Sequence, residues 1–470
     1  MQIAPKLIRP QLIRLAPAIL MVFASAGPAW AQKAAPPSAA QASGQIDVAD
    51  RASLSAAILA APAGSTIRLA PGDYIDIAVR RRIDGAPVVI TGPRDARLIR
   101  LTFANPASGW RVNGVTILAA VPGVGPYGGQ AVNFARAQDV ALDDVLISGV
   151  APGPDAWNEG SKGLLFSRAE GIAVANSEIR HVRLIASLQD SRGIVLANNR
   201  FIDAREGLQV SNVQGLIVRN NLFRGWVPRL DLKEHPDMIQ FWTRARPTGS
   251  ARVEISNNLF DAGEERAVQG IFTRAEDFEY GKAPQGFHRD WVIRNNIYFG
   301  SSKHGISLSD VQGVLVENNN VLASPHAFVG RQPVSADGRS GTGYKPFILL
   351  LRSTKAQVRG NLAAYIASTA EPGPIEQTNN QQYKPVSPKD GLNPDKSFKA
   401  PLLAGPHDPS DFALVEGSEA QRKGRGADAA QVGPRSRAEP IEPLATKARA
   451  LADTVDAFMQ GAPQVPAAKR

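Results

Sequence analysis

Val218-Arg219-Asn220-Asn221 is a short apolar run that ends in two asparagines, and this pattern returns along most of the chain. Full or near matches occur at Val174-Ala175-Asn176-Ser177, Leu196-Ala197-Asn198-Asn199, Ile255-Ser256-Asn257-Asn258, Ile293-Arg294-Asn295-Asn296 and Val316-Glu317-Asn318-Asn319. From Asn176 onward the copies are 22, 22, 37, 38 and 23 residues apart. A repeat of about 22 residues with loop insertions is typical of a solenoid whose turns stack on one another.

The residues around one asparagine pair indicate how each coil is built. Gly207-Leu208-Gln209-Val210-Ser211 alternates apolar and polar residues, as a half-buried strand does. After a turn, a second strand follows at Leu216-Ile217-Val218. The side chains of the apolar pair Leu222-Phe223 then face the interior again. Asparagine suits the second turn because it tolerates left-handed backbone angles, and stacked asparagine side chains hydrogen-bond from coil to coil. We therefore assign the asparagines a structural role.

This pattern resembles the pectate-lyase-like right-handed parallel β-helix superfamily over residues 48–435. Gly64-Ser65-Thr66-Ile67-Arg68-Leu69…Pro71-Gly72-Asp73-Tyr74 is similar to a frequent start of such folds in secreted polysaccharide enzymes. Val415-Glu416-Gly417-Ser418…Gly424…Val432-Gly433-Pro434 is similar to the segment that often closes them. We expect an all-β protein, a single right-handed parallel β-helix solenoid of about ten coils. A short N-terminal cap helix over residues 53–61 and an irregular C-terminal tail ending in a helix over residues 444–459 complete the expected fold.

The two ends of the chain differ in composition from the repeats. Three basic residues precede an apolar stretch over residues 15–24, and Ala29-Trp30-Ala31 is a small-x-small cleavage signal. This predicts a secretory signal peptide, the alternative being an uncleaved anchor helix, for which the apolar core is short. No second apolar run is long enough to span a bilayer. The expected parts are a signal peptide (1–31), a flexible leader (32–46), the parallel β-helix domain (47–365) and an irregular C-terminal extension with a terminal helix (366–470).

The amino-acid composition limits the kinds of site and partner that the chain can have. The 470 residues include no cysteine, which excludes thiol catalysis and zinc–thiolate sites, and the formal net charge is +10. Such an excess of positive charge suits an anionic partner, although solubility explains it equally well. Nucleic acid is a poor fit, because aromatic residues make up only 6% of the chain and the predicted signal peptide implies export. We expect a monomer in the periplasm or the medium, with an acidic polysaccharide as partner.

Alignment of the coils on their asparagine turns predicts a row of arginines after each first strand. The aligned residues are Arg136, Arg168, Arg192, Asn212, Arg244, Arg274 and Asp310, with Arg352 one place off. Equivalent positions of stacked strands lie about 4.8 Å apart. A guanidinium ladder of this spacing suits a polymer with one carboxylate per sugar. A solvated edge whose arginine stems cover apolar surface is the alternative.

The densest reactive cluster lies in a loop insertion. Asp231-Leu232-Lys233-Glu234-His235-Pro236-Asp237 leads directly into the strand Met238-Ile239-Gln240-Phe241-Trp242. Long irregular loops on a regular scaffold usually carry function, although a solvated charged loop would look the same. Two coils later, Lys303-His304-Gly305-Ile306-Ser307 enters the equivalent strand in the same way.

A lyase acting on uronic acids needs a cation at the carboxylate, a base for the C5 proton and an acid for the leaving O4. His235 is the expected base because its ordinary pKa lies near working pH, and a desolvated Lys233 is the substitute. Arg244 and Arg274 are the expected cations, and His304 or Tyr280 the expected proton donor. The remaining candidates are Asp237 for catalysis and Gln209, Gln240, Trp242, Arg168, Arg192 and Lys303 for substrate binding.

The family motifs match only in part. Mannuronan epimerases of this superfamily carry Asp-Pro-His-Asp, which His235-Pro236-Asp237 matches in composition but not in order. Polygalacturonases carry paired aspartates and a Gly-His-Gly turn, and Lys303-His304-Gly305 resembles only the turn. The clustered aspartates typical of calcium-dependent pectate lyases are not seen, so we predict neither a metal nor a cofactor.

The leading hypothesis is a β-eliminative lyase of an acidic, uronic-acid-containing polysaccharide. A C5-epimerase would use the same groups, and a glycoside hydrolase would use Asp237 with Glu234 or Asp310 as acid and base. A non-catalytic polysaccharide-binding or surface β-helix, for which the arginine ladder alone would suffice, is the remaining alternative.

Overall fold

The computed structural model describes residues 44–121, 129–149, 160–227, 236–262, 268–324, 346–369, 375–383, 397–399 and 406–461. The predicted signal peptide and most of the predicted leader lie outside these residues. Gln45 and Ile46, expected at the end of the leader, instead belong to the first strand, β1 (Gln45–Val48), which pairs with β2 (Thr66–Leu69). Among the described residues, no helix combines the length and the apolar character that crossing a membrane requires.

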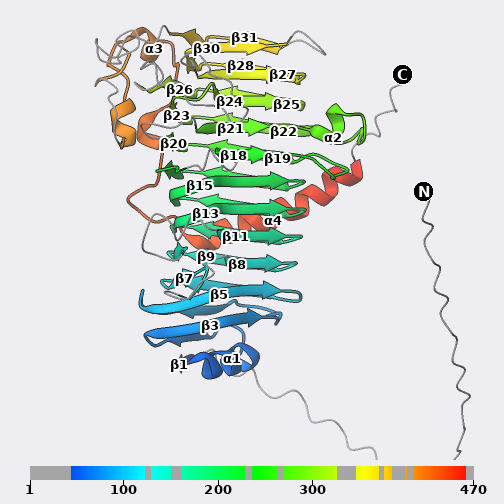
Figure 1. Ribbon diagram of the computed structural model, residues 1–470, viewed down its shortest axis with the longest axis vertical. Coiled ribbons are helices and arrows are strands. Elements are labelled where there is room, and N and C mark those ends of the chain that lie inside the picture. The colour runs from blue at the N-terminus through cyan, green and yellow to red at the C-terminus, as the bar shows by residue number, and fades with distance from the viewer. Residues whose placement is uncertain are drawn as a thin grey trace, which may run out of the picture. The chain divides into compact units, whose positions relative to one another are not determined.

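The described strands pair in parallel and form two hydrogen-bonded sheets (Figure 1). One sheet, called sheet A here, contains 13 strands in the described part of the chain. Their order is β1, β2, β4 (Val88–Thr91), β6 (Ser108–Asn113), β9 (Gln138–Asp143), β12 (Glu170–Ala175), β14 (Arg192–Ala197), β16 (Gln214–Arg219), β19 (Ala251–Ser256), β22 (His288–Arg294), β25 (Val311–Glu317), β28 (Thr354–Arg359) and β31 (Ile375–Thr378).

The second sheet is divided into two ladders because its long strands bend. β13 (Glu178–Gln189) pairs with β10 through its first residues and with β11 through its last ones. β3 (Gly72–Val79), β5 (Ala96–Ala104) and β15 (Arg200–Ser211) are divided in the same way. The side ladder contains their first halves and β7 (Thr116–Leu118), β10 (Leu146–Ser148), β17 (Leu222–Arg224), β20 (Leu259–Asp261), β23 (Ile297–Gly300), β26 (Asn320–Ala323), β29 (Leu362–Ala363) and β32 (Gln381–Gln382). The front ladder contains their second halves and β8 (Gly129–Ala135), β11 (Ser161–Ser167), β18 (Asp237–Phe241), β21 (Gln269–Thr273), β24 (His304–Ser309), β27 (Phe347–Leu351) and β30 (Tyr365–Ser368).

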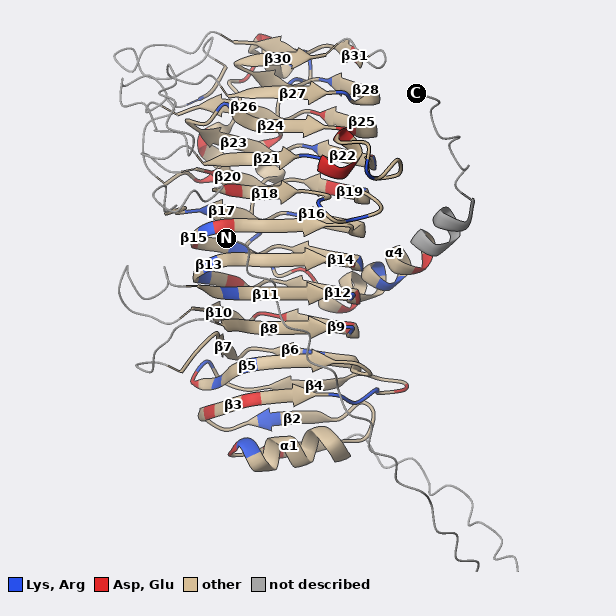
Figure 2. Cartoon of the chain, turned by 45° about the vertical axis from the view of Figure 1, so that its right-hand side comes forward, with Lys and Arg blue, Asp and Glu red and all other residues tan. Residues whose placement is uncertain are grey.

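Each turn of the chain therefore contributes one side strand, one front strand and one strand of sheet A, which is consistent with a parallel β-helix. The apolar residues of all three stack in the interior, where rings of successive coils meet. Phe103, Phe134 and Phe166 stack at centroid distances of 5.7 and 4.8 Å. Charged residues concentrate at strand ends and turns, as Figure 2 shows, so the core is apolar along its length.

The asparagine pairs form two ladders with different tasks. The first residue of each pair has a left-handed backbone, with φ of 54° at Asn220 and 56° at Asn257. The second residue is buried and bonds to the next coil: Asn221 donates from Nδ2 to Oδ1 of Asn258 at 3.0 Å. Its own Oδ1 accepts from the backbone N–H of Asn199 at 2.9 Å. The predicted structural role of the asparagines is confirmed.

The C-terminal segment, residues 406–439, returns along the outer asparagines toward earlier coils (Figure 1). Asn379 donates to the carbonyl of Lys423 at 2.7 Å, and Asn220 donates to that of Gln431 at 2.8 Å. Further along, the backbone N–H of Glu439 donates to Oδ1 of Asn176 at 2.9 Å. The segment includes a 3-10 turn at Pro409–Phe412, α3 (Glu419–Arg422) and a second 3-10 turn at Ala429–Gln431.

Two helices pack against the coils. α1 (Arg51–Ala60) buries Leu54 and Ile58 in the core at the N-terminal end of the stack. α4 (Ile441–Gly461) begins where the C-terminal segment ends and packs Leu444 and Ala448 on sheet A. The strand ladders continue past residue 365, the expected end of the coils, because β31 pairs with β28 and β32 with β29.

Candidate active site

The first residues of the front-ladder strands form one continuous row. Strand pairing puts Lys162, Leu184 and Glu206 in one register, and likewise Asp237 with Gln269 and His304 with Phe347. The pairs Leu208–Ile239 and Ile271–Ile306, extended back by two residues, place Glu206 beside Asp237 and Gln269 beside His304. Neighbours in such a row lie about 4.8 Å apart along the backbone. The row therefore places two carboxyl groups, an amide and an imidazole side by side on four consecutive strands.

Asp237 is the most unusual member of this row. Only 3% of the residue is exposed, and neither carboxylate oxygen has a hydrogen-bond partner in the described part of the chain. Burial raises its pKa to about 8, with a further contribution from the charge of Glu206. Asp237 is therefore largely protonated at neutral pH and can donate a proton.

Glu206 has the opposite environment, although it is also buried. Gln209 donates from Nε2 to its carboxylate at 3.0 Å, and the guanidinium of Arg183 lies 3.6 Å away. A cation and an amide donor favour the ionised form of a carboxyl group. Because the charge of Glu206 raises the pKa of Asp237, the proton of the pair resides preferentially on Asp237, the division of roles that acid–base catalysis requires.

His304 lies two strands beyond Asp237, between two aromatic rings. The centroids of Phe272 and Phe347 are both 5.2 Å from that of the imidazole, with the rings edge to face. Burial lowers the pKa of His304 to about 4, and the charge of Lys303 acts in the same direction. Its Nδ1 is buried without a hydrogen-bond partner among the described residues. The imidazole is therefore neutral at pH 7 and can accept a proton.

Three residues after the members of this row, the front ladder carries polar and aromatic side chains. Gln209 and Gln240 are neighbours in the register, and Phe272 follows Gln240 on the next strand. All three are half-buried. Trp242 follows β18, and the guanidinium of Arg246 lies 5.9 Å from its ring centroid. Amides and aromatic faces of this kind are able to hold a sugar ring.

The predicted arginine ladder is only partly present. Arg136 and Arg168 stand at equivalent positions after β8 and β11, both exposed and without an ion pair to any described residue. Arg192 was placed in this row wrongly: it begins β14 of sheet A and pairs with Glu170 at 2.9 Å. Asp190 takes the expected place, because its N–H follows the same bonding pattern as that of Arg168.

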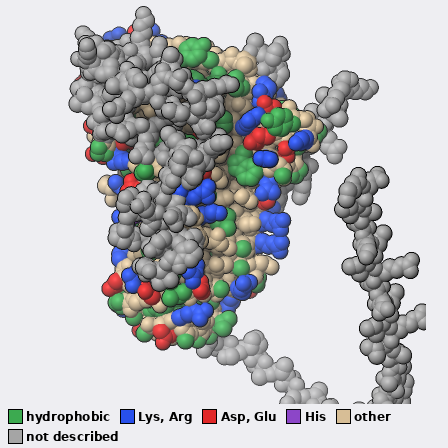
Figure 3. Space-filling model, in the orientation of Figure 1, with side chains coloured by type: hydrophobic (Ala, Val, Ile, Leu, Met, Phe, Trp, Pro, Cys, Tyr) green, Lys and Arg blue, Asp and Glu red, His purple; other side chains and the backbone are tan. Residues whose placement is uncertain are grey.

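In the coils after Asn212, acidic residues neutralise two of the arginines expected in the ladder. Arg352 binds Asp310 through two hydrogen bonds of 2.7 Å each. Arg274 donates to Glu279 and to the hydroxyl of Tyr280, both at 2.9 Å, which ties it to α2 (Glu276–Glu279). Figure 3 accordingly shows red and blue side chains mixed around α2, with blue ones below it along the same edge. Acidic neighbours relieve the repulsion that a continuous ladder would create.

The remaining candidates are separate from the row. Arg244 is exposed in the turn after β18 and has no ion pair with any described residue. The predicted base His235 and its substitute Lys233, with Asp231 and Glu234, lie outside the described residues, immediately before Asp237. Within the described residues, no group of three or more histidines and acidic side chains is placed to hold a metal ion.

Glu206 and Gln269 were missed by the sequence analysis, although a signal was present. The substrate-binding candidates Gln209 and Gln240 are paired in the structure, and the residues three places before them are Glu206 and Asp237. The same spacing leads from Phe272 to Gln269 and from Ser307 to His304. One step of alignment would have revealed the row.

No protein-family model and no curated protein sequence matches the chain. Solved structures do resemble it. They include the PL6 family alginate lyase AlyGC, at 14% identity over 83% of this chain and 57% of that one, with a TM-score of 0.48. An alginate lyase from Paenibacillus sp. str. FPU-7 aligns at 13% identity over 72% and 99% of the two chains, with a TM-score of 0.42. The surface protein and adhesin PfbA of Streptococcus pneumoniae aligns at 11% identity over 71% and 93%, with a TM-score of 0.44.

The parallel β-helix that the resemblance implied is seen in the strand pairing of the chain itself. The solved structures that resemble the chain include both enzymes and an adhesin. What the chain does must therefore be argued from its own residues.

Proposed function

We propose that this protein is an enzyme that cleaves an acidic polysaccharide, with Asp237 as the proton donor. The observation that carries the proposal is the buried, unpartnered carboxyl of Asp237, whose pKa is raised to about 8 beside Glu206. An unpaired buried carboxyl destabilises the fold and is typical of a functional site. A polymer bound along the front ladder would meet this acid at the start of β18.

The reaction that fits best is β-elimination. Gln269 stands between Asp237 and His304, so a sugar unit bound across it would have an acid on one side and a neutral imidazole on the other. His304 would take the C5 proton, and Asp237 would protonate the leaving O4. Lys303, next to the base, would neutralise the uronate carboxylate and so make the C5 proton more acidic. His235, predicted as the base from sequence, stays an alternative for that role.

Hydrolysis is the second candidate, and the carboxyl pair favours it. Asp237 would protonate the glycosidic oxygen while ionised Glu206 acts as nucleophile or activates water, as paired carboxyl groups do in glycosidases. Asp237 is the acid in both reactions, but the second catalytic group is His304 in elimination and Glu206 in hydrolysis. They also differ in products, because only elimination leaves a double bond in the sugar.

The exposed arginines support an acidic rather than a neutral polymer. Arg136, Arg168 and Arg244 lie at or near the turn edge of the front ladder and have no ion pair within the described residues. Guanidinium groups bind carboxylates in bidentate geometry. We propose that this edge holds the carboxylates of sugars flanking the cleaved bond. The predicted signal peptide would bring the enzyme to the periplasm or the medium.

The decisive experiment mixes the protein with a panel of uronic-acid polymers and records both ultraviolet absorbance and reducing ends. Absorbance that rises with new reducing ends establishes elimination, and reducing ends alone establish hydrolysis. Asp237→Asn should abolish either signal. Asp290→Asn is the matched control, because Asp290 is an exposed carboxyl on β22 of sheet A.

His304→Gln and Glu206→Gln then separate the two reactions. Loss of turnover in His304→Gln with activity kept in Glu206→Gln supports elimination, and the reverse supports hydrolysis. Unchanged turnover in Asp237→Asn would contradict the assigned acid. Binding of a polymer without any new product would indicate a binding protein instead.

A further inference from the structure

The row of the front ladder continues past His304 into two aromatic residues. Strand pairing puts Phe347 beside His304 and Tyr365 beside Phe347. The residue after each aromatic one, Ile348 or Ile366, belongs to the core. Because side chains alternate along a strand, the two aromatic side chains face outward. Phe347 is half-buried and Tyr365 is 51% exposed, so the C-terminal coils present aromatic surface in line with the proposed catalytic residues.

In the opposite direction, toward the N-terminal coils, the front ladder carries cations. Lys162 belongs to the same row and stands two strands before Glu206. Arg136 and Arg168 follow β8 and β11 and are exposed, without an ion pair to any described residue. In the C-terminal coils, by contrast, Arg352 of the turn edge is neutralised by an ion pair. The two ends of the front ladder therefore differ in chemistry, one being cationic and the other aromatic.

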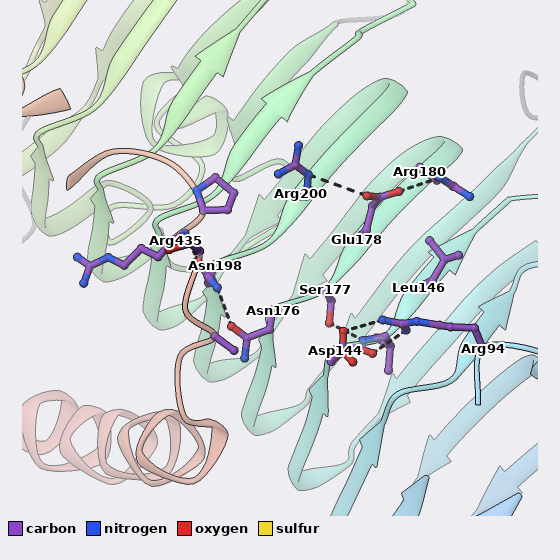
Figure 4. Close-up of a pocket in the computed structure, with 14 residues that line it drawn as sticks. Arg94, Asp144, Leu146, Asn176, Ser177, Glu178, Arg180, Asn198, Arg200 and Arg435 are labelled. Carbon is purple, nitrogen blue, oxygen red and sulfur yellow. Dashed lines mark hydrogen bonds and ion pairs between the residues drawn. The ribbon is translucent and has the colours of Figure 1, made fainter. Parts of the chain in front are cut away.

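The cavity of about 460 Å³ between the asparagine turns and residues 434–438 has a different lining (Figure 4). Glu178 pairs there with Arg180 at 3.0 Å and with Arg200 at 4.0 Å. None of the described residues that line this cavity is aromatic. It therefore offers no ring on which a sugar would stack, whereas the front ladder offers two beside the proposed base.

The order of the proposed catalytic groups sets the direction of a bound polymer. Asp237 protonates the glycosidic oxygen, which joins C1 of one sugar to C4 of the next sugar toward the reducing end. In elimination, His304 takes the C5 proton of that next sugar, which therefore lies on the His304 side of Asp237. In hydrolysis, Glu206 acts at C1 of the other sugar, which lies on the opposite side of Asp237. Both reactions direct the reducing end of the polymer toward the C-terminal coils.

We propose that Phe347 and Tyr365 form a stacking subsite for the sugars on the reducing-end side of the cleaved bond. The C–H groups on one face of a pyranose pack against an aromatic ring without the help of a charge. Sugars on the non-reducing side would instead place their carboxylates along Arg168 and Arg136. The direction of the polymer rests on the proposed function, whereas the subsite requires only that a polymer binds along the front ladder.

The first test is isothermal titration calorimetry of the whole protein carrying Asp237→Asn. Hexasaccharides of polygalacturonate, polymannuronate and hyaluronate are the separate probes. At least one should bind, and Tyr365→Ala should weaken that binding about fivefold, as loss of one aromatic contact does. Tyr365→Phe keeps the ring and should bind like the parent. Leu59→Ala is the matched control, because Leu59 is an exposed apolar residue on α1, at the N-terminal end of the stack.

The second test maps the cleaved bond in the active protein, using the hexasaccharide that binds, with a fluorescent label at its reducing end. Tyr365→Ala weakens binding on the reducing-end side, so cleavage should move toward that end and release shorter labelled products than the parent does. Arg168→Ala weakens the other side and should release longer labelled products. Opposite shifts in the two variants would establish the direction of the polymer.

The outcomes separate this proposal from the proposed function. Equal binding by the parent and Tyr365→Ala overturns the subsite, even where turnover upholds the proposed function. Binding that is weakened equally in Leu59→Ala and Tyr365→Ala also overturns it. Binding that depends on Tyr365, without any product from the active protein, supports the subsite and contradicts the proposed function. Longer labelled products from Tyr365→Ala overturn the direction, and no binding of any hexasaccharide overturns both proposals.

Discussion

Glu206 and Asp237 occupy equivalent positions on neighbouring strands of the front ladder, and the ionised carboxylate of the first raises the pKa of the second. Glu206 has an amide donor and a guanidinium nearby, whereas Asp237 has no partner among the described residues. The asymmetry lies in the surroundings rather than in the residue type. It assigns the proton to Asp237 and leaves Glu206 charged.

The first prediction concerns the pH dependence of cleavage. The acid Asp237 must be protonated and the base His304 must be neutral, so kcat/KM should be level between pH values of about 4 and 8 and fall outside them. Glu206→Gln removes a charge that raises the pKa of Asp237, and the alkaline limb should then move to lower pH. An alkaline limb that stays in place would show that Asp237 is not the titrating acid.

A second prediction concerns stability. The pKa of Asp237 rises from 3.8 to about 8 on folding, so the folded state loses stability progressively as the pH rises from about 4 to 8. At pH 7 the neutral amide of Asp237→Asn should therefore raise the melting temperature while abolishing turnover. Differential scanning calorimetry at pH 4 and pH 7 measures the effect, which should shrink at pH 4.

Asp261 supplies the contrast, because it is equally buried but well partnered. It accepts from Nε of Arg224 at 3.1 Å and from the backbone N–H of His407 at 3.1 Å. Burial alone would raise its pKa, but the contacts with His407 and Arg224 outweigh burial and lower it. Asp261→Asn should lower the melting temperature at pH 7, opposite to Asp237→Asn. A change of melting temperature in the same direction for both variants would refute the assigned difference between the two carboxyl groups.

A third prediction separates the exposed arginines from the paired one. Arg168→Ala and Arg136→Ala should each raise KM for the polymer about two- to fivefold with little change in kcat, as loss of an exposed charge contact does. The effect should weaken at high salt. Arg192→Ala, which removes the pair with Glu170 on sheet A, should leave KM unchanged. An equal rise in KM for all three variants would show that Arg192 also belongs to the binding surface.

The fourth prediction concerns the two asparagine ladders. Asn221→Ala removes a buried amide that makes four side-chain hydrogen bonds, so it should lower the free energy of unfolding by more than about 3 kcal/mol. Asn220→Gly keeps the left-handed turn and loses mainly the bond to Gln431, which should cost about 1 kcal/mol. Urea unfolding of both variants measures the difference.

The sequence predicted the fold because the asparagine pairs report both a turn geometry and a repeat length. Asn220 shows the left-handed backbone expected of it, and Asn221 the buried stacking. The arginine row was harder to predict, because a two-residue difference in turn length moves Arg192 onto sheet A and puts Asp190 in its place. Asp237 was recognised as a charged residue near a loop, but its burial depends on how the coils stack.

The path of the C-terminal segment was not predicted, although residues 415–434 resemble the segment that often closes such folds. Nothing in the residues 423–439 shows that their backbone would pair with asparagines more than two hundred residues earlier, as Glu439 does with Asn176. Hydrogen bonds from an irregular backbone leave no periodic signal. The outer asparagines were therefore explained by turn geometry alone, although they also hold this segment.

Because the C-terminal segment packs on earlier coils, its docking must be a late step in folding. The coils can stack as they emerge, but Asn176, Asn220 and Asn379 find their last partners only in residues synthesised after the whole stack. The C-terminal segment can therefore make all three contacts only where the coils already stand in register. Without this segment, the three asparagine side chains would lose the backbone partners that it supplies and would turn to solvent instead.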